Sequence, residues 1–522
     1  MFVKKTLDVL VIFCITLVAG CSQQDSFTSL NRKIAESQPQ NTWVASNLDS
    51  IASYFDSVPA NIYDLYLAKG DIEHVQIAFK TDSADSYIIE RFAESKTDIA
   101  FTSRNLVHFN RSDDVLVPTS GKVRVADSAK LWLTYSTTQQ TKAGTYNEIV
   151  RFKANNREFL FKIRLHVYNC ALPEIPTIPS VMGIDPNRMG IKGLSEEEAS
   201  IKKKKWSDLL LTFRISPYFS NWIGQSLETK DMRVENISSP WAWNDPRTIE
   251  YMNDPRFTSV ALPSHFLSDD ELNKFLDVLR KNDLLKKAYF YIWDEPARIG
   301  DYALIQKEAA RIKKFAPDAR VLTSFYCGPK DGPQKDDLFA VFDYLKESTD
   351  IFCQGVWSLS ESELRADSCR RAALNQGAEW WTYVCMSDYP GLSIANNFPI
   401  RNRAVMWRVF KEQSSGFLYW VVNSFDSINP LVPRQNLPHG DGILIFPGEQ
   451  FGLDNELVVS SRLERWRDGV EDYELLKLLE SKNGREASLE LLKLVHINST
   501  SQTKHSQEVV KFKKRLLEQL SL

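Results

Sequence analysis

The strongest constraint on the fold is a regular alternation of strand-like and helix-like segments in the second half of the chain. Apolar runs rich in aromatic and β-branched residues recur here, and amphipathic stretches such as residues 269–281 and 302–314 separate them. This alternation is typical of a parallel β/α architecture, because a crossover between parallel strands usually contains a helix. The runs cover residues 180–184, 214–217, 258–262, 288–293, 320–324, 350–353, 380–384 and 416–421. Since a closed (β/α)8 TIM-type barrel has this number of strands, we predict one over residues 176–482.

The segment before the barrel has a different period. Residues 158–167 alternate apolar and polar side chains, and polar or Gly-containing turns separate this run from similar ones. We therefore predict an N-terminal antiparallel β-sandwich over residues 42–175. The proline-rich stretch at residues 172–179 is a stiff linker that marks the boundary. Residues 483–522 are predicted to form a C-terminal helical segment.

The N-terminus indicates an export signal. Residues 1–20 place two lysines before an apolar core that is shorter than a membrane span. The ending Leu-Val-Ala-Gly-Cys21 resembles a bacterial lipobox, which implies cleavage before Cys21 and lipidation of its thiol. Residues 21–41 would then form a flexible tether. We expect a protein anchored to the bacterial outer membrane by lipid alone, on the periplasmic or the surface face. A plain signal peptide with a chance cysteine is the alternative.

Composition excludes several other classes of function. The formal net charge is −3, so neither nucleic acid nor an acidic polymer is an expected partner. Five cysteines remain beyond residue 21, without the paired short spacing of a disulfide framework or zinc knuckle. Buried small apolar side chains are the better interpretation of these cysteines. No cluster has the spacing of metal ligands, and we expect no metal or cofactor.

The candidate catalytic residues follow the fourth predicted barrel strand. The run Ala288-Tyr-Phe-Tyr-Ile-Trp ends abruptly in Asp294, Glu295 and Pro296. In a β/α barrel, chemistry takes place at the carboxyl ends of the strands. Pro296 favours an extended Glu295, and a strand end would let both acids reach the mouth of the barrel. A helix start, with Asp294 as the cap and proline in the first turn, is the structural alternative.

Neighbouring acids on one strand suit a particular glycosidase mechanism. Most retaining enzymes hold two carboxyls on opposite sides of the sugar, whereas substrate-assisted enzymes use the substrate's own 2-acetamido oxygen as the nucleophile. Glu295 would act as acid and base, with a pKa raised by aromatic neighbours such as Trp293. Asp294 would stay ionised, accept the acetamide N–H and stabilise positive charge.

Other strand ends supply candidate residues for binding a sugar. Tyr383 is the preferred donor to the acetamide oxygen, because it lies near the end of the seventh run. Asp441, in a Gly-rich stretch of the last long loop, would bind a hydroxyl or simply hold its turn. The remaining candidates are aromatic rings for stacking and one amide for a hydroxyl: Trp381, Trp420, Tyr326 and Asn423. Any one of these rings is more often packing than ligand contact.

Four motifs in this order resemble glycoside hydrolase family 123. They are Tyr-Ile-Trp-Asp-Glu-Pro296, Gly416-Phe-Leu-Tyr-Trp420, the run from Gly440 to Gly448, and the run from Ser461 to Glu474. The resemblance implies a β-sandwich followed by a β/α barrel. It also implies β-N-acetylgalactosaminidase activity by substrate assistance, on glycans or glycoconjugates with a terminal N-acetylhexosamine. Asp294 and Glu295 would inherit the stabiliser and acid/base roles, while Arg462 and Glu464 match a late helix motif that we expect to be architectural.

Two alternatives to this function remain open. The first is a noncatalytic glycan-binding lipoprotein that kept the barrel. The second is a glycosidase for a sugar without an acetamide group. That enzyme would need a second carboxylate facing the pair, with Asp388 or Asp441 as candidates.

Overall fold

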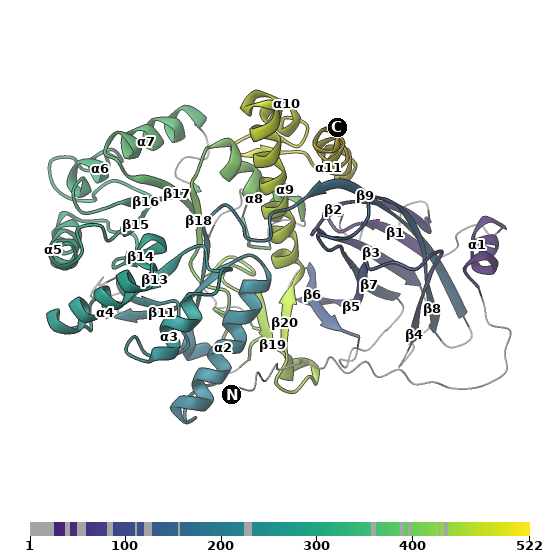
Figure 1. Ribbon diagram of the computed structural model, residues 1–522, viewed down its shortest axis with the longest axis horizontal. Helices are drawn as coiled ribbons and strands as arrows, with labels where there is room; N and C mark the ends of the chain where they lie inside the picture. The colour runs from purple at the N-terminus through teal and green to yellow at the C-terminus, as the bar shows by residue number, and fades with distance from the viewer. Residues whose placement is uncertain are drawn as a thin grey trace, which may run out of the picture.

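Two sheet-based parts lie side by side, and helix α9 (Ser461–Asn483) lies between them (Figure 1). The computed structural model describes residues 26–36, 42–49, 59–80, 87–109, 112–119, 128–154, 157–223, 232–356, 362–386, 391–394, 398–426, 429–432 and 437–522. The predicted signal peptide and Cys21 lie outside these residues. Within them, no helix is both long and apolar enough to cross a bilayer.

A short helix occupies part of the predicted tether. We expected residues 21–41 to be flexible, but α1 (Phe27–Glu36) packs on the N-terminal part of the protein. Leu30 and Ile34 are buried against Ile149 of strand β8 (Gly144–Ala154). Their i, i+4 spacing makes a small apolar stripe, and a stripe of this size is stable only when another surface buries it. That surface comes from distant sequence, which is why the prediction was wrong here.

The N-terminal part contains two sheets that share an apolar core. The larger sheet has the order β1 (Thr42–Ser46), β3 (Ile72–Lys80), β7 (Ser128–Ser136), β5 (Ala100–Phe109), β6 (Ser112–Pro118), β20 (Leu457–Ser460) and β19 (Ile445–Pro447). The smaller has the order β2 (Ile62–Lys69), β9 (Arg157–Ala171), β8 (Gly144–Ala154) and β4 (Tyr87–Ala93). The predicted period of two is confirmed in β9, where buried and less buried side chains alternate.

The sandwich departs from the prediction in two ways. Strand β2 runs parallel to β9, so the smaller sheet is mixed rather than antiparallel. Strands β19 and β20, which we placed within the barrel segment, extend the larger sheet, because β20 pairs with β6 and β19 pairs with β20. This pairing joins residues more than 300 positions apart, and local sequence patterns carry no information about it.

The second part contains a nine-stranded sheet. Its order is β12 (Arg233–Ile237), β11 (Ser216–Ile223), β10 (Ser180–Ile184), β18 (Gly416–Tyr419), β17 (Glu379–Val384), β16 (Ile351–Gly355), β15 (Val321–Phe325), β14 (Ala288–Tyr291) and β13 (Val260–Leu262). Each predicted run overlaps one of its strands, and these eight pair in parallel where they are neighbours.

Strand β12 was not predicted, and it makes the sheet mixed. It runs antiparallel to β11. On its other side, the N–H groups of Val234 and Ser238 donate to the carbonyls of Ile292 and Ala261, at 3.4 and 3.0 Å. Strand β12 therefore lies between β11 and β13 and nearly closes the sheet, instead of the regular (β/α)8 barrel that we predicted.

Helices cover the outer side of this sheet, as the alternation predicted. They are α2 (Glu196–Thr212), α3 (Pro246–Met252), α4 (Asp269–Lys281), α5 (Ile299–Phe315), α6 (Ala340–Leu345), α7 (Glu363–Asn375) and α8 (Ile400–Lys411). Side chains alternate between the two faces of each strand, and this divides the apolar residues into one core inside the sheet and one between the sheet and the helices. Tyr289 and Trp381 belong to a cluster enclosed by the strands, whereas Phe290 and Trp380 pack towards the helices.

The C-terminal segment is helical, with α10 (Arg485–Leu492) and α11 (Ser506–Ser521) separated by the short strands β21 (His496–Asn498) and β22 (Ser501–Gln502). Helix α11 packs against α9 and against β9 and β2 of the sandwich. The end of the chain therefore joins the two parts of the molecule.

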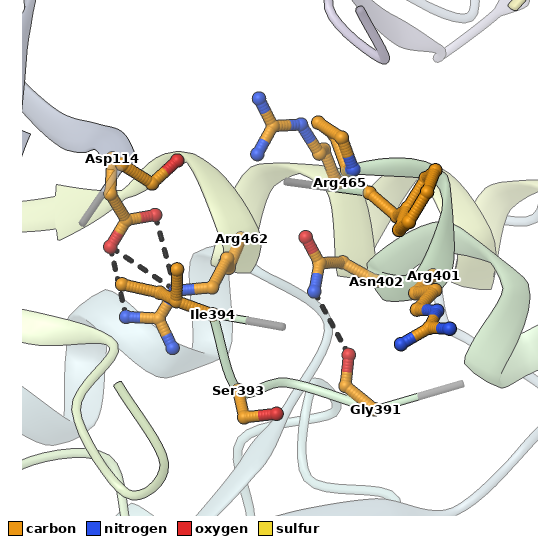
Figure 2. A pocket seen from close by; sticks show the side chains of 11 residues that line it. Asp114, Gly391, Ser393, Ile394, Arg401, Asn402, Arg462 and Arg465 are labelled. Atoms are coloured by element: carbon orange, nitrogen blue, oxygen red, sulfur yellow. Dashed lines mark hydrogen bonds and ion pairs between the residues drawn. The ribbon is translucent and has the colours of Figure 1, made fainter. Parts of the chain in front are cut away.

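Helix α9 carries buried charges that bind both parts. Arg462 forms a two-pronged ion pair with Asp114 of β6, with an Nη2–Oδ2 distance of 2.9 Å. Figure 2 shows this pair beside Asn402 of α8, which donates to the Gly391 carbonyl and borders a cavity of only about 20 Å³. Glu464 pairs with Arg104 at 2.5 Å. These contacts agree with the architectural role predicted for Arg462 and Glu464.

Candidate active site

The acidic pair follows strand β14, where β12 holds the backbone in place. The N–H of Asp294 donates to the Met232 carbonyl at 3.0 Å, and Trp293 forms a β-bridge with Arg233. Helix α5 begins only at Ile299. The alternative in which Asp294 caps a helix is therefore wrong, because the acids lie in the loop before it.

Glu295 has a left-handed backbone with a φ of 48°. We expected Pro296 to impose an extended conformation, and the structure corrects this. A left-handed conformation costs a residue other than glycine roughly 1–2 kcal/mol, and such conformations gather at functional sites. Here the N–H of Glu295 donates to Ser324 Oγ at 3.1 Å, which helps to hold the turn after the strand.

Two hydroxyl groups donate to a single oxygen of Asp294. Ser324 Oγ donates to Oδ1 at 2.9 Å, and the Tyr291 hydroxyl donates to the same atom. No hydrogen bond reaches Oδ2 from the part of the chain that the structure describes. One side of the carboxylate is thus fixed by the protein, and the other is left for a ligand.

Glu295 accepts a hydrogen bond from a neighbouring strand end. The Tyr383 hydroxyl donates to its Oε1 at 2.5 Å. Burial raises the pKa of Glu295 to about 8, and the negative charge of Asp294 adds to this effect. The Tyr383 hydrogen bond and the nearby Lys330 ammonium act in the opposite direction. Trp293, which we expected to supply the apolar surroundings, packs in the helix-side core instead.

The protein stabilises the charged forms of the two acids unequally. Burial also raises the pKa of Asp294, and carboxyl groups this close titrate as a pair. Two hydroxyls stabilise the charged form of Asp294, whereas only one stabilises that of Glu295. We therefore assign the role of proton carrier to Glu295 and that of the more readily ionised acid to Asp294.

Strand β17 brings Tyr383 to the site but not Trp381. Both residues point into the enclosure of the sheet, two positions apart. Tyr383 lies near the end of the strand and reaches Glu295. Trp381 lies one layer of side chains deeper in the enclosure and is 0% exposed. Its indole N–H donates to Glu379 at 3.0 Å. Trp381 is a core residue, and its predicted contact with substrate is wrong.

The residues predicted after strand β18 have mainly structural contacts. Asn423 is buried, and its amide exchanges two hydrogen bonds of 2.8 and 2.9 Å with the backbone of Asp185. It therefore joins two strand ends, and at 0% exposed it offers no surface to a sugar hydroxyl. Asp441 is also buried, and it accepts from Tyr419 at 2.9 Å and from the Met386 N–H at 3.1 Å. Of its two predicted roles, the structure supports holding the loop.

The remaining predicted aromatic residues are partly exposed. Trp420 follows β18, and its ring lies close enough to Gly442 that a side chain there would clash. This close approach explains a glycine with a φ of 71° at that position. Tyr326 follows β15, and its hydroxyl accepts from Lys330 at 3.1 Å. The Lys330 N–H donates to the Ala297 carbonyl at 2.7 Å, so this loop lies beside the acidic pair.

Sequence reasoning missed Tyr291, Ser324 and Lys330. The alternation of side chains along the strand could have identified Tyr291 as an inward-facing residue, because it lies on the same face as Tyr289. Ser324 could be found only from the register between strands β14 and β15, in which Leu322 pairs with Tyr291. Asp388, the alternative opposing carboxylate, lies outside the described residues.

Comparisons with known proteins identify a family for the second part of the chain. Residues 229–479 match the family model described as "Glycoside hydrolase 123, catalytic domain". A family 123 glycoside hydrolase from Clostridium perfringens, analysed for glycolipid glycan hydrolysis, has a similar structure: the TM-score is 0.66 at 14% identity, over 92% of this chain and 97% of that one. At this identity the likeness shows the fold alone.

Two further solved structures are far less similar. A GH10 xylanase with a bacterial Ig-like domain, from termite gut, has a TM-score of 0.30 at 9% identity, over 80% of this chain and 100% of that one. A chitinase domain from Pyrococcus furiosus has a TM-score of 0.31 at 10% identity, over 57% and 97%. Neither supports an argument, and no curated protein sequence matches. The matched range contains Asp294 and Glu295, and the match identifies residues 229–479 of this chain as a catalytic domain of glycoside hydrolase family 123.

Proposed function

We propose that the enzyme releases a terminal β-linked N-acetylhexosamine, with N-acetylgalactosamine as the expected sugar, by a substrate-assisted retaining mechanism. The observation that carries this proposal is the position of two adjacent acids after strand β14, with Asp294 held by the hydroxyls of Tyr291 and Ser324 and Glu295 held by that of Tyr383. The Clostridium perfringens relative is described as acting on glycolipid glycans, which supports a glycoconjugate as the substrate here.

In the first step the 2-acetamido oxygen of the bound sugar attacks the anomeric carbon. The bond to the leaving oxygen breaks, and Glu295 gives that oxygen its proton. Since Oε1 accepts from Tyr383, the proton resides on Oε2. Asp294 Oδ2 accepts the acetamide N–H and stabilises the positive charge of the oxazolinium ion.

In the second step water opens the oxazolinium ion. The glutamate, now ionised, removes a proton from the water as its oxygen attacks the anomeric carbon. The bond to the acetamide oxygen breaks and regenerates the N-acetyl group. Two inversions at the same carbon give net retention, and Glu295 ends in its protonated form.

Tyr383 is proposed to change partners when substrate binds. In the free enzyme its hydroxyl donates to Glu295. An acetamide oxygen placed beside Asp294 would compete for the same donor, and a hydrogen bond there would orient the nucleophile. Releasing Glu295 from this bond also makes it a weaker acid, so the proton stays in place until the glycosidic oxygen arrives.

The alternative of an opposing carboxylate gains little support. Of its two candidates, Asp441 is buried and both of its oxygens accept from protein groups. Using Asp441 as a nucleophile would require breaking both bonds. The adjacent pair needs no such rearrangement.

A panel of nitrophenyl glycosides tests the proposal. We expect turnover of β-N-acetylhexosaminides, inhibition by a thiazoline mimic of the oxazolinium ion, and no comparable turnover of β-hexosides that carry a 2-hydroxyl. Glu295→Gln should lower kcat by about 10²–10⁴-fold, the usual contribution of general acid–base catalysis. Glu347→Gln, at an exposed acid away from the site, is the matched control. Full activity of Glu295→Gln, or equal turnover of a 2-hydroxyl sugar without thiazoline inhibition, would contradict the mechanism.

We also propose that Cys21 anchors the enzyme in the bacterial cell envelope through acyl chains. The support is the lipobox-like sequence and the position of α1, which begins only six residues later. Six residues span at most roughly 20 Å, which would keep the sandwich near the membrane. Metabolic labelling with a palmitate analogue tests this. Cys21→Ala should lose the label and move to the aqueous phase in a detergent partition, and retained label would contradict the proposal.

A further inference from the structure

The outer side of strands β11 and β12 is only partly covered, by helix α2 packing on β11. In a β/α fold, the helix after each parallel strand normally packs on the outer side of the sheet. Strand β11 is followed by β12 instead, and α3 begins only at Pro246. A cavity of about 640 Å³ fills the uncovered place, between the start of α2 and the loops at residues 239–245 and 263–267. This volume is within the usual range for sites that bind small molecules.

The cavity is separate from the acidic pair. Phe219, Asn221 and Glu235 line it from the outward faces of the two strands. The alternate residues Tyr218 and Val234 belong to the cluster enclosed by the sheet. The sheet therefore separates the cavity from the enclosure into which the catalytic residues point, and neither acid of the pair lines it.

Two polar groups at the cavity have no hydrogen-bonding partner in the described part of the protein. The Trp241 indole N–H is buried and unpartnered there. Lys203 lies over the ring of Phe219 at 5.8 Å, and no described carboxylate is within ion-pair distance of its ammonium. Leaving the buried indole N–H without a partner costs about 1–3 kcal/mol. A ligand or solvent that accepts hydrogen bonds would remove that cost.

Aromatic rings provide an apolar platform at the rim. Trp241 and Trp243 line the cavity, and Phe266 is 69% exposed. The loop that carries Phe266 is held in position, since the Glu235 carboxylate accepts the N–H groups of Ser264, His265 and Phe266 at 3.2, 2.9 and 3.3 Å. An exposed ring on a fixed loop is suited to stacking against a ligand.

The charges and the backbone narrow the class of ligand. Four acids and two bases line the cavity. One of the bases, Arg247, is already paired with Glu197 and Asp245 at 2.8 Å. This acidic excess disfavours phosphate, sulfate and nucleic acid. Strands β11 and β12 are hydrogen-bonded on both sides, so an extended peptide finds no free strand edge to pair with. Neutral sugars have hydroxyls that donate and accept, and ring faces that stack on aromatic groups.

We propose that this cavity is a second, noncatalytic carbohydrate site that binds a neutral oligosaccharide. Trp243 and Phe266 form the stacking platform, and Lys203 and Trp241 donate to hydroxyl or acetamide oxygens. The site does not depend on which glycosidic bond the acidic pair cleaves. On an enzyme with a glycan substrate, it would hold a second part of the same chain and raise its local concentration.

Calorimetric titration of the Glu295→Gln variant tests the proposal without turnover. The probes are lacto-N-tetraose and chitotriose as neutral sugars, and sialylated lacto-N-tetraose as an acidic one. Two changes address the cavity: Phe266→Ala removes the exposed ring, and Ala199→Trp fills the space from α2. Phe339→Ala, at another exposed ring, is the matched control. Circular dichroism and thermal melts establish that each variant is folded.

We expect at least one neutral probe to bind, with affinity lowered at least tenfold by Phe266→Ala, lost in Ala199→Trp and unchanged in Phe339→Ala. When the same two cavity changes are made in the enzyme that retains Glu295, both variants should hydrolyse a nitrophenyl glycoside at the normal rate. Three results would overturn the proposal: no binding of any neutral probe, binding that persists in Ala199→Trp, or preference for the acidic probe.

Discussion

Replacing Ser324 by alanine probes how the catalytic pair keeps its charge distribution. The Ser324 hydroxyl donates to Asp294 Oδ1 at 2.9 Å and accepts the Glu295 N–H at 3.1 Å. A hydrogen bond to a charged group contributes about 1.5–3 kcal/mol. Its loss should destabilise the ionised form of Asp294 and leave the left-handed turn at Glu295 with one bond fewer.

The expected effect follows from that free energy. Since 1.36 kcal/mol corresponds to one pKa unit, the pKa of Asp294 should rise by about 1–2 units in Ser324→Ala. The acid limb of the pH profile should move upwards by a similar amount. The same loss of stabilisation in the transition state lowers kcat by about 10–100-fold. The expected change in KM is smaller, because Ser324 is buried and lies behind the carboxylate.

The assay is kcat and KM for a nitrophenyl N-acetylhexosaminide between pH 4 and pH 9, about the range spanned by the usual carboxyl pKa and that of Glu295. Thr323→Val is the matched control, because Thr323 is next in the strand and bonds Thr349 on the other face. An unchanged acid limb in Ser324→Ala, or an equal loss in Thr323→Val, would refute this explanation of how the pair is held.

Three further predictions concern single contacts. Tyr383→Phe removes the hydrogen bond that lowers the pKa of Glu295, so the basic limb of the pH profile should move above pH 8 and kcat should fall; an unmoved limb would contradict the assignment. Burial lowers the pKa of His74, but two carboxylates of α9 overcome this and the net pKa is raised. Its protonated form therefore stabilises the fold fully below about pH 6.5, and the stabilisation is lost as pH rises through the raised pKa. The difference in Tm between the natural protein and His74→Gln should therefore shrink as the pH rises through that pKa. A difference that stays constant with pH would contradict this prediction. Arg462→Met leaves the Asp114 carboxylate buried without its partner and should cost about 3–5 kcal/mol in urea unfolding; a loss below 1 kcal/mol would contradict this.

Local patterns located most elements of the fold. The strand-like runs of the second half all overlap strands of one sheet, because a buried parallel strand needs a continuous apolar segment whatever its partners. The position of Asp294 and Glu295 at a strand end also followed from the sequence. The pairing of β20 with β6, and the docking of α1 on Ile149, did not. Those contacts depend on surfaces that form only when distant segments meet.

The candidate site divides in the same way. The sequence alone determined which acids stand at the end of β14, since the change from an apolar run to charged residues is local. Only the tertiary structure decided that Tyr383 reaches the pair whereas Trp381 lies a layer below it. Alternation assigns a side chain to a face of the sheet, but not to a depth within it. Depth depends on the register between strands, which also brought Ser324 to Asp294. Register is set by packing across the whole sheet, and no short segment of the chain contains that information.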